Sequence, residues 1–362
     1  MLAVDEINAA GGVKGRKIKV ITEDTQSKPE EAANAVTKLI SQDNVVAIIG
    51  EVASSSSLAA APIAQTNKVP MITPSSTNPS VTEKGDYIFR MCFIDPYQGE
   101  AMAKYLAGTG VKKAAILIDV KSDYSTGLAK FFRETFVANG GKIVATGSYS
   151  KGDNDFRAQL TSIKATKPEV IFVPGYYNDI GQIAIQARDL GITQPLVGGD
   201  GWESPKLIEI GGKSLEGGFY SNHYYANDPA PVVRDFVQKF EARYKEKPDA
   251  MAALAYDSVR VLAEAMMRAD KLEGASLRDA IAQTKGFVGV TGTITLGPDR
   301  NPIAKKLVIM EVKNGAFELK ATVDPAGESA PAPTATTGTT GTTTTTTSTA
   351  APVTATTGTT GS

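Results

Sequence analysis

Short apolar runs alternate with amphipathic segments along most of the chain. Apolar runs at residues 45–49, 69–72, 114–118 and 170–173 have the length and composition of strands that are buried on both faces. Between them, apolar residues recur at spacings of three and four, which predicts helices. Strands that alternate with helices are typical of parallel sheets covered on both sides. The pattern therefore predicts an α/β protein.

The other predicted elements continue this alternation. A helix at 2–10 ends at the glycines 11–12, an extended run follows at 17–23, and a capping box at 27–30 begins the next helix. Further helices are expected at 56–65, 96–108, 125–139, 156–166, 180–190, 231–244, 252–269 and 276–284. Further strands are expected at 142–146, 195–198, 291–296 and 307–312, with a turn cluster at 297–301 between the last two.

Two such series, at about 1–90 and 95–220, predict two doubly wound, Rossmann-like lobes. The later elements return to both lobes, so the chain crosses between them several times and forms a multi-strand hinge. We expect lobe 1 to comprise residues 1–91 and 225–290, and lobe 2 to comprise residues 92–224 and 291–325. Residues 326–362 remain as a Thr-rich tail.

The tail has a composition that does not support a packed core. Residues 329–362 contain no charged residue, and the eight-residue sequence TATTGTTG occurs at both 334–341 and 354–361. So few apolar side chains cannot offset the entropy lost on ordering, which predicts disorder. A flexible linker or stalk and a cloning artefact both fit this segment.

Composition excludes several functional classes. Lys and Arg total 38 against 39 Asp and Glu, and no basic cluster indicates nucleic-acid binding. One cysteine and one histidine exclude an internal disulfide and most zinc sites, and make a Cys–His nucleophile pair unfavourable. A Ser-His-Asp triad would need His223, which we interpret as a structural or surface residue. We expect no enzymatic activity, no metal and no cofactor.

The chain contains no run of about 18 apolar residues, so no transmembrane helix is expected. Asp5 and Glu6 follow the first residue closely, and the N-terminus has no signal-peptide pattern. We therefore expect no export signal in the chain as written.

Two hydroxyl-rich turns follow neighbouring strands of lobe 1. They are GEVASSSS at 50–57, which leads into a helix, and TPSSTNP at 73–79. Ligands of open α/β sheets bind beyond the carboxyl ends of the strands, and helix N-termini favour anions. Neither turn has the spacing of a phosphate-binding loop, so a carboxylate is the expected anion. Ordinary capping by Ser and Thr is the alternative for each turn.

The corresponding turns of lobe 2 combine aromatic and acidic residues. They are DVKSDY at 119–124, PGYYND at 174–179 and GGDGW at 198–202. Aromatic faces and a carboxylate favour a cation such as an ammonium group. A turn aspartate and packed tyrosines are the alternatives. Together the two lobes predict a cleft that binds a zwitterion and closes around it.

These motifs, in this order, resemble the leucine/isoleucine/valine-binding protein family, the type I periplasmic binding proteins of ABC importers. The resemblance covers nearly all of 1–325, and its carriers are LAVDEINAAGGV at 2–13, the turns at 50–57 and 73–79, DYSTG at 123–127, PGYY at 174–177 and GGDG at 198–201. It implies a substrate-binding protein that captures a branched-chain or similar amino acid. A membrane permease would be its partner, the protein would be monomeric, and its native full-length form would be periplasmic or at the cell surface.

The resemblance also implies roles for individual residues. Ser54, Thr77 and the backbone at Ser75 would hold the ligand carboxylate, whereas Asp200 and Tyr176 would hold its ammonium group. The remaining candidates for ligand contact are Ala53, Ser76, Tyr124, Tyr177, Trp202 and Met251.

The chain departs from the family pattern at its start, since the strand and loop that usually precede the LAVDE helix are absent. We expect a late start assignment or a truncation. A ligand-sensing domain of a receptor or regulator with the same fold is the alternative function.

Overall fold

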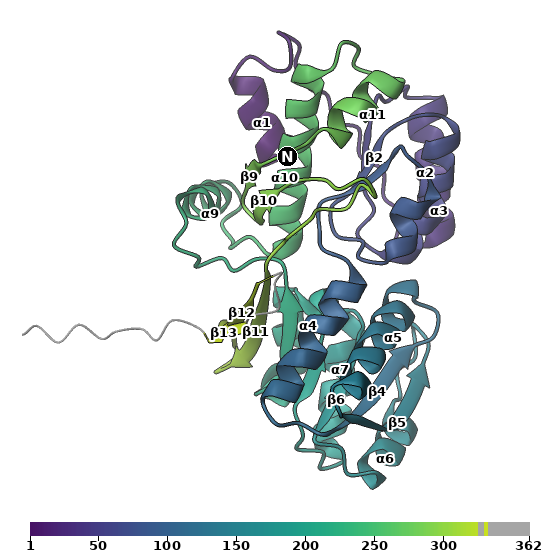
Figure 1. The fold of residues 1–362 in the computed structure, drawn as a ribbon, viewed down its shortest axis with the longest axis vertical. Helices are drawn as coiled ribbons and strands as arrows, with labels where there is room; N and C mark the ends of the chain where they lie inside the picture. The colour runs from purple at the N-terminus through teal and green to yellow at the C-terminus, as the bar shows by residue number, and fades with distance from the viewer. Residues whose placement is uncertain (325–328, 332–362) are drawn as a thin grey trace, which may run out of the picture. The chain divides into compact units, whose positions relative to one another are not determined.

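The structure is a computed structural model that describes residues 1–324 and 329–331 (Figure 1). These residues belong to one compact unit, residues 1–332. Most of the predicted disordered tail lies outside the described residues. Its described part is β13 (Ser329–Pro331), which pairs with β12 (Ala316–Val323).

Lobe 1 is built on a three-stranded parallel sheet. Its strands are β1 (Ile48–Ile49), β2 (Met71–Thr73) and β3 (Ile88–Arg90). Adjacent residues of β2 point to opposite faces: Met71 packs in one core cluster with α2 and α3, and Ile72 packs in another with α10 and α11. The helices of lobe 1 are α1 (Leu2–Ala9), α2 (Pro29–Ser41), α3 (Ser54–Thr66), α9 (Pro231–Tyr244), α10 (Ala250–Arg268) and α11 (Gly274–Ala282). The sheet is thus covered on both faces, as predicted.

Lobe 2 is built on an eight-stranded mixed sheet in the order β13-β12-β11-β8-β7-β6-β4-β5. Strands β4 to β8 pair in parallel, and β8, β11, β12 and β13 pair antiparallel. Their bounds are β4 (Lys113–Asp119), β5 (Lys142–Tyr149), β6 (Val170–Phe172), β7 (Leu196–Gly198), β8 (Phe219–Asn222) and β11 (Leu307–Lys313).

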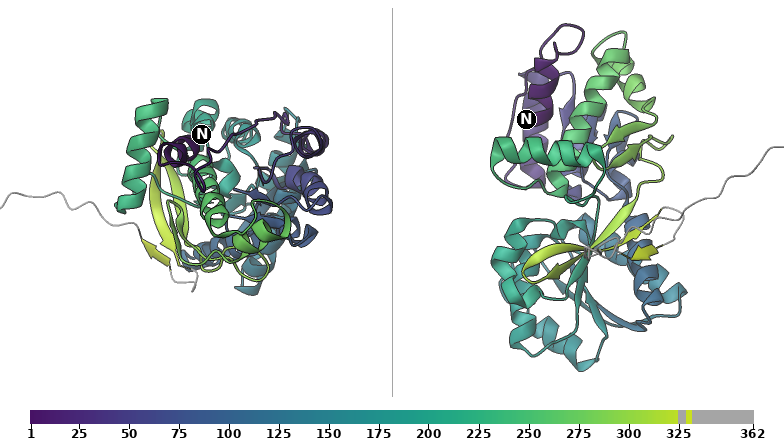
Figure 2. Two further views of the ribbon diagram at one scale, coloured as in Figure 1. Left: turned by 90° about the horizontal axis from the view of Figure 1, so that it is seen from above. Right: turned by 90° about the vertical axis from the view of Figure 1, so that its left-hand side faces the viewer.

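Helices cover both faces of the larger sheet (Figures 1 and 2). Ile116 of β4 packs with α4 (Asp95–Gly108) and α5 (Asp123–Ala138), whereas its neighbour Leu117 packs with α6 (Arg157–Ala165) and α7 (Tyr177–Asp189). The short α8 (Pro205–Gly211) lies with the second group. Among the residues described, no helix has the length and hydropathy that a membrane crossing requires.

Within the described residues, the chain passes between the lobes in three segments. They lie between β3 and α4, between β8 and α9, and between β10 (Gly292–Ile294) and β11. The strand β10 forms a hairpin with β9 (Phe287–Gly289), and Phe287 and Ile294 share a core cluster with α10. The residue bounds that the sequence suggests for the two lobes stay a prediction.

Several local predictions differ from the structure. The capping box at 27–30 is wrong, because α2 begins at Pro29 and its N-cap is Lys28, which makes no side-chain cap. The extended run at 17–23 joins no sheet among the described residues; the side chain of Asn8 instead pairs with the backbone N–H and C=O of Ile18, at 2.7 and 2.9 Å. The pattern also missed three strands. β3 has only three residues, β9 lies in a short hairpin, and β12 is partly exposed.

The buried face of α5 provides a test of the core. Phe136 is fully buried, while its neighbour Val137 is 51% exposed. We expect Phe136→Ala to lower the free energy of unfolding by about 3–5 kcal/mol, because it removes core contacts and leaves a cavity. Val137→Ala is the matched control and should change it little. Chemical denaturation followed by circular dichroism measures both, and equal effects would contradict the packing described here.

Candidate functional site

One cavity of about 70 Å³ lies between the turns of the two lobes. A single buried water needs roughly 10–15 Å³, so the cavity accommodates a larger molecule. Its lining combines hydroxyls, aromatic rings and two carboxyl groups, and consists of Val52, Ser54, Ser75, Thr77, Tyr124, Tyr176, Tyr177, Asp200, Gly201, Glu203 and Met251.

Lobe 1 contributes the start of α3 and the loop after β2. Ser54 is the first residue of α3, and its Oγ accepts a hydrogen bond from the Asn78 backbone N–H at 3.3 Å. Thr77 Oγ1 is buried and has no hydrogen-bond partner among the described residues. Exposed N–H groups at a helix start and free hydroxyls are the usual ligands of a carboxylate. This side of the cavity therefore has the chemistry of an anion site.

Arg90 holds the Thr77 loop from behind. Its guanidinium is fully buried and donates to Ser76 O at 2.6 Å, Asn78 O at 2.8 Å and Asn301 Oδ1 at 2.6 Å. A trans peptide directs its C=O and N–H to opposite sides, so the Thr77 N–H points away from the guanidinium. Burial lowers the pKa of Arg90, but an arginine stays protonated in proteins. No ion pair of the described residues involves it, and its charge lies behind the anion side of the cavity.

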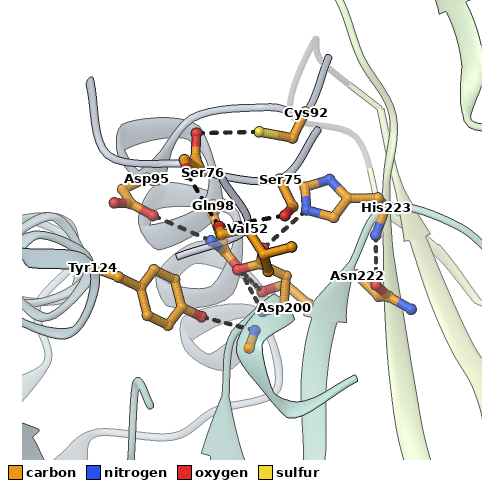
Figure 3. Close-up of polar contacts among 12 residues, drawn as sticks. Val52, Ser75, Ser76, Cys92, Asp95, Gln98, Tyr124, Asp200, Asn222 and His223 are labelled. Atoms are coloured by element: carbon orange, nitrogen blue, oxygen red, sulfur yellow. Dashed lines mark hydrogen bonds and ion pairs between the residues drawn. The ribbon is translucent and has the colours of Figure 1, made fainter. Parts of the chain in front are cut away.

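Lobe 2 contributes Asp200, which begins a short 3-10 helix after β7 (Figure 3). Its backbone N–H donates to Gln98 Oε1 at 2.8 Å, and the next N–H, that of Gly201, donates to Tyr124 Oη at 3.0 Å. The flanking glycines allow this close packing. A Cβ on Gly199 would lie 2.5 Å from Tyr124 Oη, and one on Gly201 would lie 2.6 Å from the Gly175 carbonyl oxygen.

Aromatic rings form the wall next to this carboxylate. Tyr124 and Tyr176 are in contact, with ring centroids 5.2 Å apart, and both line the cavity with Tyr177. The Oδ1 atom of Asp200 is buried and unpaired within the described part of the chain. A free carboxylate oxygen beside tyrosine rings suits an ammonium group.

Two further carboxyl groups lie near Asp200. Burial raises the pKa of Asp95 to about 8, and the neighbouring Asp200 contributes to this rise. Burial also raises the pKa of Glu203 to about 7, although Tyr220 Oη donates a hydrogen bond to it. At neutral pH Asp95 is thus largely protonated.

The structure brings together most of the residues predicted for the site. Eight of them line the cavity, namely Ser54, Ser75, Thr77, Tyr124, Tyr176, Tyr177, Asp200 and Met251. Ala53, Ser76 and Trp202 do not. Ser76 Oγ bonds within its own lobe, to Val52 O at 3.0 Å, and the Trp202 indole is fully buried in the core of lobe 2, where its Nε1 donates to Val173 O at 3.0 Å.

Sequence reasoning missed both lining and supporting residues. Val52, Gly201 and Glu203 line the cavity, and each lies inside or directly after a turn that was singled out. Glu203 could have been identified from its closeness to Asp200 in the sequence. Arg90, Gln98 and His223 lie behind the cavity lining, and no local motif marks them.

A model of the periplasmic binding protein family matches residues 1–316. The chain belongs to this family, and its relatives lie in the leucine/isoleucine/valine-binding branch that the sequence motifs indicated. An amino acid binding protein of Pseudomonas aeruginosa is 33% identical over 267 residues, which are 73% of this chain and 71% of the relative.

Two solved structures are similar over nearly their full length. A leucine binding protein of Thermotoga maritima is 40% identical with a TM-score of 0.86, covering 90% of this chain and 93% of that chain. A branched-chain amino acid transporter substrate binding protein of Streptococcus pneumoniae, solved with isoleucine, is 37% identical with a TM-score of 0.85, covering 90% and 92%. These similarities confirm the predicted fold class, a type I periplasmic binding protein.

The role of Arg90 can be tested through stability. Arg90→Met should lower the free energy of unfolding by about 3 kcal/mol or more, because several buried acceptors lose their donor. Arg157→Met, which removes an arginine from an exposed pair with Asp155, is the control and should leave the thermal midpoint unchanged. Equal midpoints for both variants would show that Arg90 does not hold the loop.

Asp95 should make stability depend on pH. The ordinary pKa of this carboxyl group is 3.8, and in the folded chain it is about 8. Between these two pH values the folded state binds more protons than the unfolded state, so the free energy of unfolding falls as pH rises through this window. Asp95→Asn mimics the protonated carboxyl group and should flatten the profile, with a gain over the wild type above pH 8. Thermal midpoints from pH 5 to pH 9 measure this, and parallel profiles would contradict a raised pKa.

Proposed function

We propose that this protein is the substrate-binding protein of an ABC importer and captures an amino acid, branched-chain or similarly small, by closure of its two lobes. The observation that carries the proposal is the polarity of the cavity. The unpaired hydroxyl of Thr77 and the start of α3 lie on one side, and the unpaired oxygen of Asp200 lies on the other. A zwitterion matches both sides, and the protein would bind it without catalysing a reaction.

The proposed binding mode assigns the carboxylate to Ser54, Thr77 and the backbone at Ser75. The ammonium group binds Asp200 and Tyr176. Tyr124 and Tyr177 close the wall beside the ammonium group. The ligand side chain would then face the remaining lining residues, which are Val52, Gly201, Glu203 and Met251.

Closure requires that the ligand stabilise the closed state over the open one. Exposed hydrogen bonds also join the lobes directly: Asn78 Nδ2 donates to Asp123 O at 2.8 Å, and Ser55 Oγ donates to Asp123 Oδ2 at 2.7 Å. Exposed hydrogen bonds of this kind add little net stability. A zwitterion that binds both lobes would supply the larger share.

The names of the relatives support this assignment over a sensor domain, since they describe amino acid and leucine binding proteins and a transporter substrate binding protein. We propose on the same basis that the native protein works as a monomer in the periplasm or at the cell surface and delivers its ligand to a membrane permease. A ligand-sensing domain remains the second candidate.

Calorimetric titration with a panel of L-amino acids tests the proposal. We expect heat and 1:1 stoichiometry with at least one aliphatic member. Asp200→Asn should weaken its binding about 100-fold or more, because the ammonium group loses its charged partner in a buried site. Asp189→Asn, at an exposed position of α7, is the matched control and should bind as the wild type does. A wild-type protein that binds no amino acid would refute the proposed function.

A further inference from the structure

His223 contacts Asp200 from the segment that leaves lobe 2. It directly follows β8, its side chain is fully buried, and its Nε2 lies 3.0 Å from Asp200 Oδ2 (Figure 3). The imidazole also stacks on Phe93, with ring centroids 3.7 Å apart. Phe93 belongs to the segment between β3 and α4. His223 therefore links the carboxylate of the cavity to two of the segments that join the lobes.

The surroundings of the imidazole determine its protonation state. Its Nδ1 is buried and has no partner among the described residues, and burial lowers the pKa of His223. A neutral imidazole carries one N–H, and an ionised carboxylate only accepts. The proton therefore lies on Nε2 and is donated to Asp200 Oδ2. A second proton on Nδ1 would leave a charged donor unpaired in the core, which is costly.

The two oxygens of Asp200 are thereby distinguished. Oδ2 is held by His223, and Oδ1 has no partner in the described structure. The backbone of Asp200 is fixed separately by Gln98, whose Oε1 also accepts from Ser221 Oγ at 2.7 Å. Neither contact brings a positive charge to the carboxylate. An arginine or lysine in place of His223 would neutralise it.

We propose that His223 is a positioning residue, whose neutral Nε2–H holds one oxygen of Asp200 and leaves the other free for the ammonium group of the ligand. The inference rests on the proposed function, because it assumes that an ammonium group binds Asp200. The charged or titratable groups that interact electrostatically with this pair from other elements are Cys92 and Lys305, on segments between the lobes, Asp95 and Tyr124, on α4 and α5, and Tyr176, directly before α7.

Ligand binding provides the first test. His223→Phe keeps an aromatic ring against Phe93 but removes the donor, whereas His223→Gln keeps an N–H donor near the position of Nε2. We expect His223→Phe to weaken the binding of L-leucine roughly tenfold or more and to leave 4-methylpentanoate, the same molecule without its amino group, unaffected. His223→Gln should restore leucine binding to within a few-fold. Thermal midpoints of both variants establish that they fold.

The outcomes separate positioning from a structural role. Loss of affinity for both ligands by the same factor would show that His223 only supports the fold, and wild-type affinity for leucine in His223→Phe would overturn the proposal directly. If His223→Phe does not fold, the folded His223→Gln variant provides the test. The proposal would then be overturned if His223→Gln bound leucine no better than Asp200→Asn does.

A measurement without ligand tests the contact itself. The chain has one histidine, so long-range ¹H–¹⁵N spectra of the imidazole show a single residue. We expect the neutral Nε2–H tautomer from pH 6 to pH 8. An Nδ1–H tautomer or an imidazolium in this range would overturn the proposal even if leucine binds. The expected tautomer in a wild-type protein that binds no amino acid would instead refute the proposed function and, with it, the ammonium role of Asp200.

Discussion

The geometry of the site depends on hydrogen bonds among polar groups that are buried where the chain passes between the lobes. Lys305 shows it most directly. Its ammonium group is fully buried and donates to Met91 O at 2.9 Å and to Thr291 Oγ1 at 2.6 Å, while Thr291 donates to Asp257. An unpaired group at such a place would cost several kcal/mol. Since these partners lie on different segments of the chain, satisfying them fixes the segments relative to one another.

The same burial shapes the electrostatics of the cavity. Desolvation raises the pKa of Asp95 to about 8 and lowers that of Lys305 to about 8, so at neutral pH Asp95 is largely protonated and uncharged, whereas Lys305 keeps most of its charge. Arg90 keeps its charge behind the hydroxyl turns, and Asp200 presents a carboxylate on the opposite side. What remains is a fixed dipole across the cavity, positive toward lobe 1 and negative toward lobe 2. Such a field distinguishes a zwitterion from a simple anion or cation.

Site residues that directly follow strands could be predicted from the sequence, whereas residues whose positions depend on partners far away in the chain could not. Ser54, Thr77 and Asp200 follow strands directly, so the rule that ligands bind beyond strand ends found them. Trp202 was a candidate through its proximity to Asp200, but the tight helical turn directs the indole into the core. Arg90 lies in a three-residue strand without alternation, and its acceptors come from residues 76–82 and from Asn301. No periodicity in the sequence encodes such long-range pairs.

The fold was predictable for a similar reason. Strands covered on both faces have continuous apolar runs, so β1, β2, β4, β6 and β7 were found, although the three-residue β3 was missed. The hairpin β9–β10, of which only β10 was expected, depends on a distant carboxylate. Asp257 of α10 accepts from the backbone N–H groups of Val290 and Thr291, both at 2.8 Å. This contact holds the turn of the hairpin, and its two partners are more than 30 positions apart in the chain.

The glycines beside Asp200 limit how this protein could diverge. Any side chain at Gly199 or Gly201 would collide with Tyr124 or with the Gly175 carbonyl, so the turn that presents Asp200 has almost no freedom to change. Val52 and Met251 line the same cavity with apolar side chains. In the proposed binding mode, a change of ligand would therefore come from substitutions at such positions, while the glycines and the turn that presents Asp200 stay as they are.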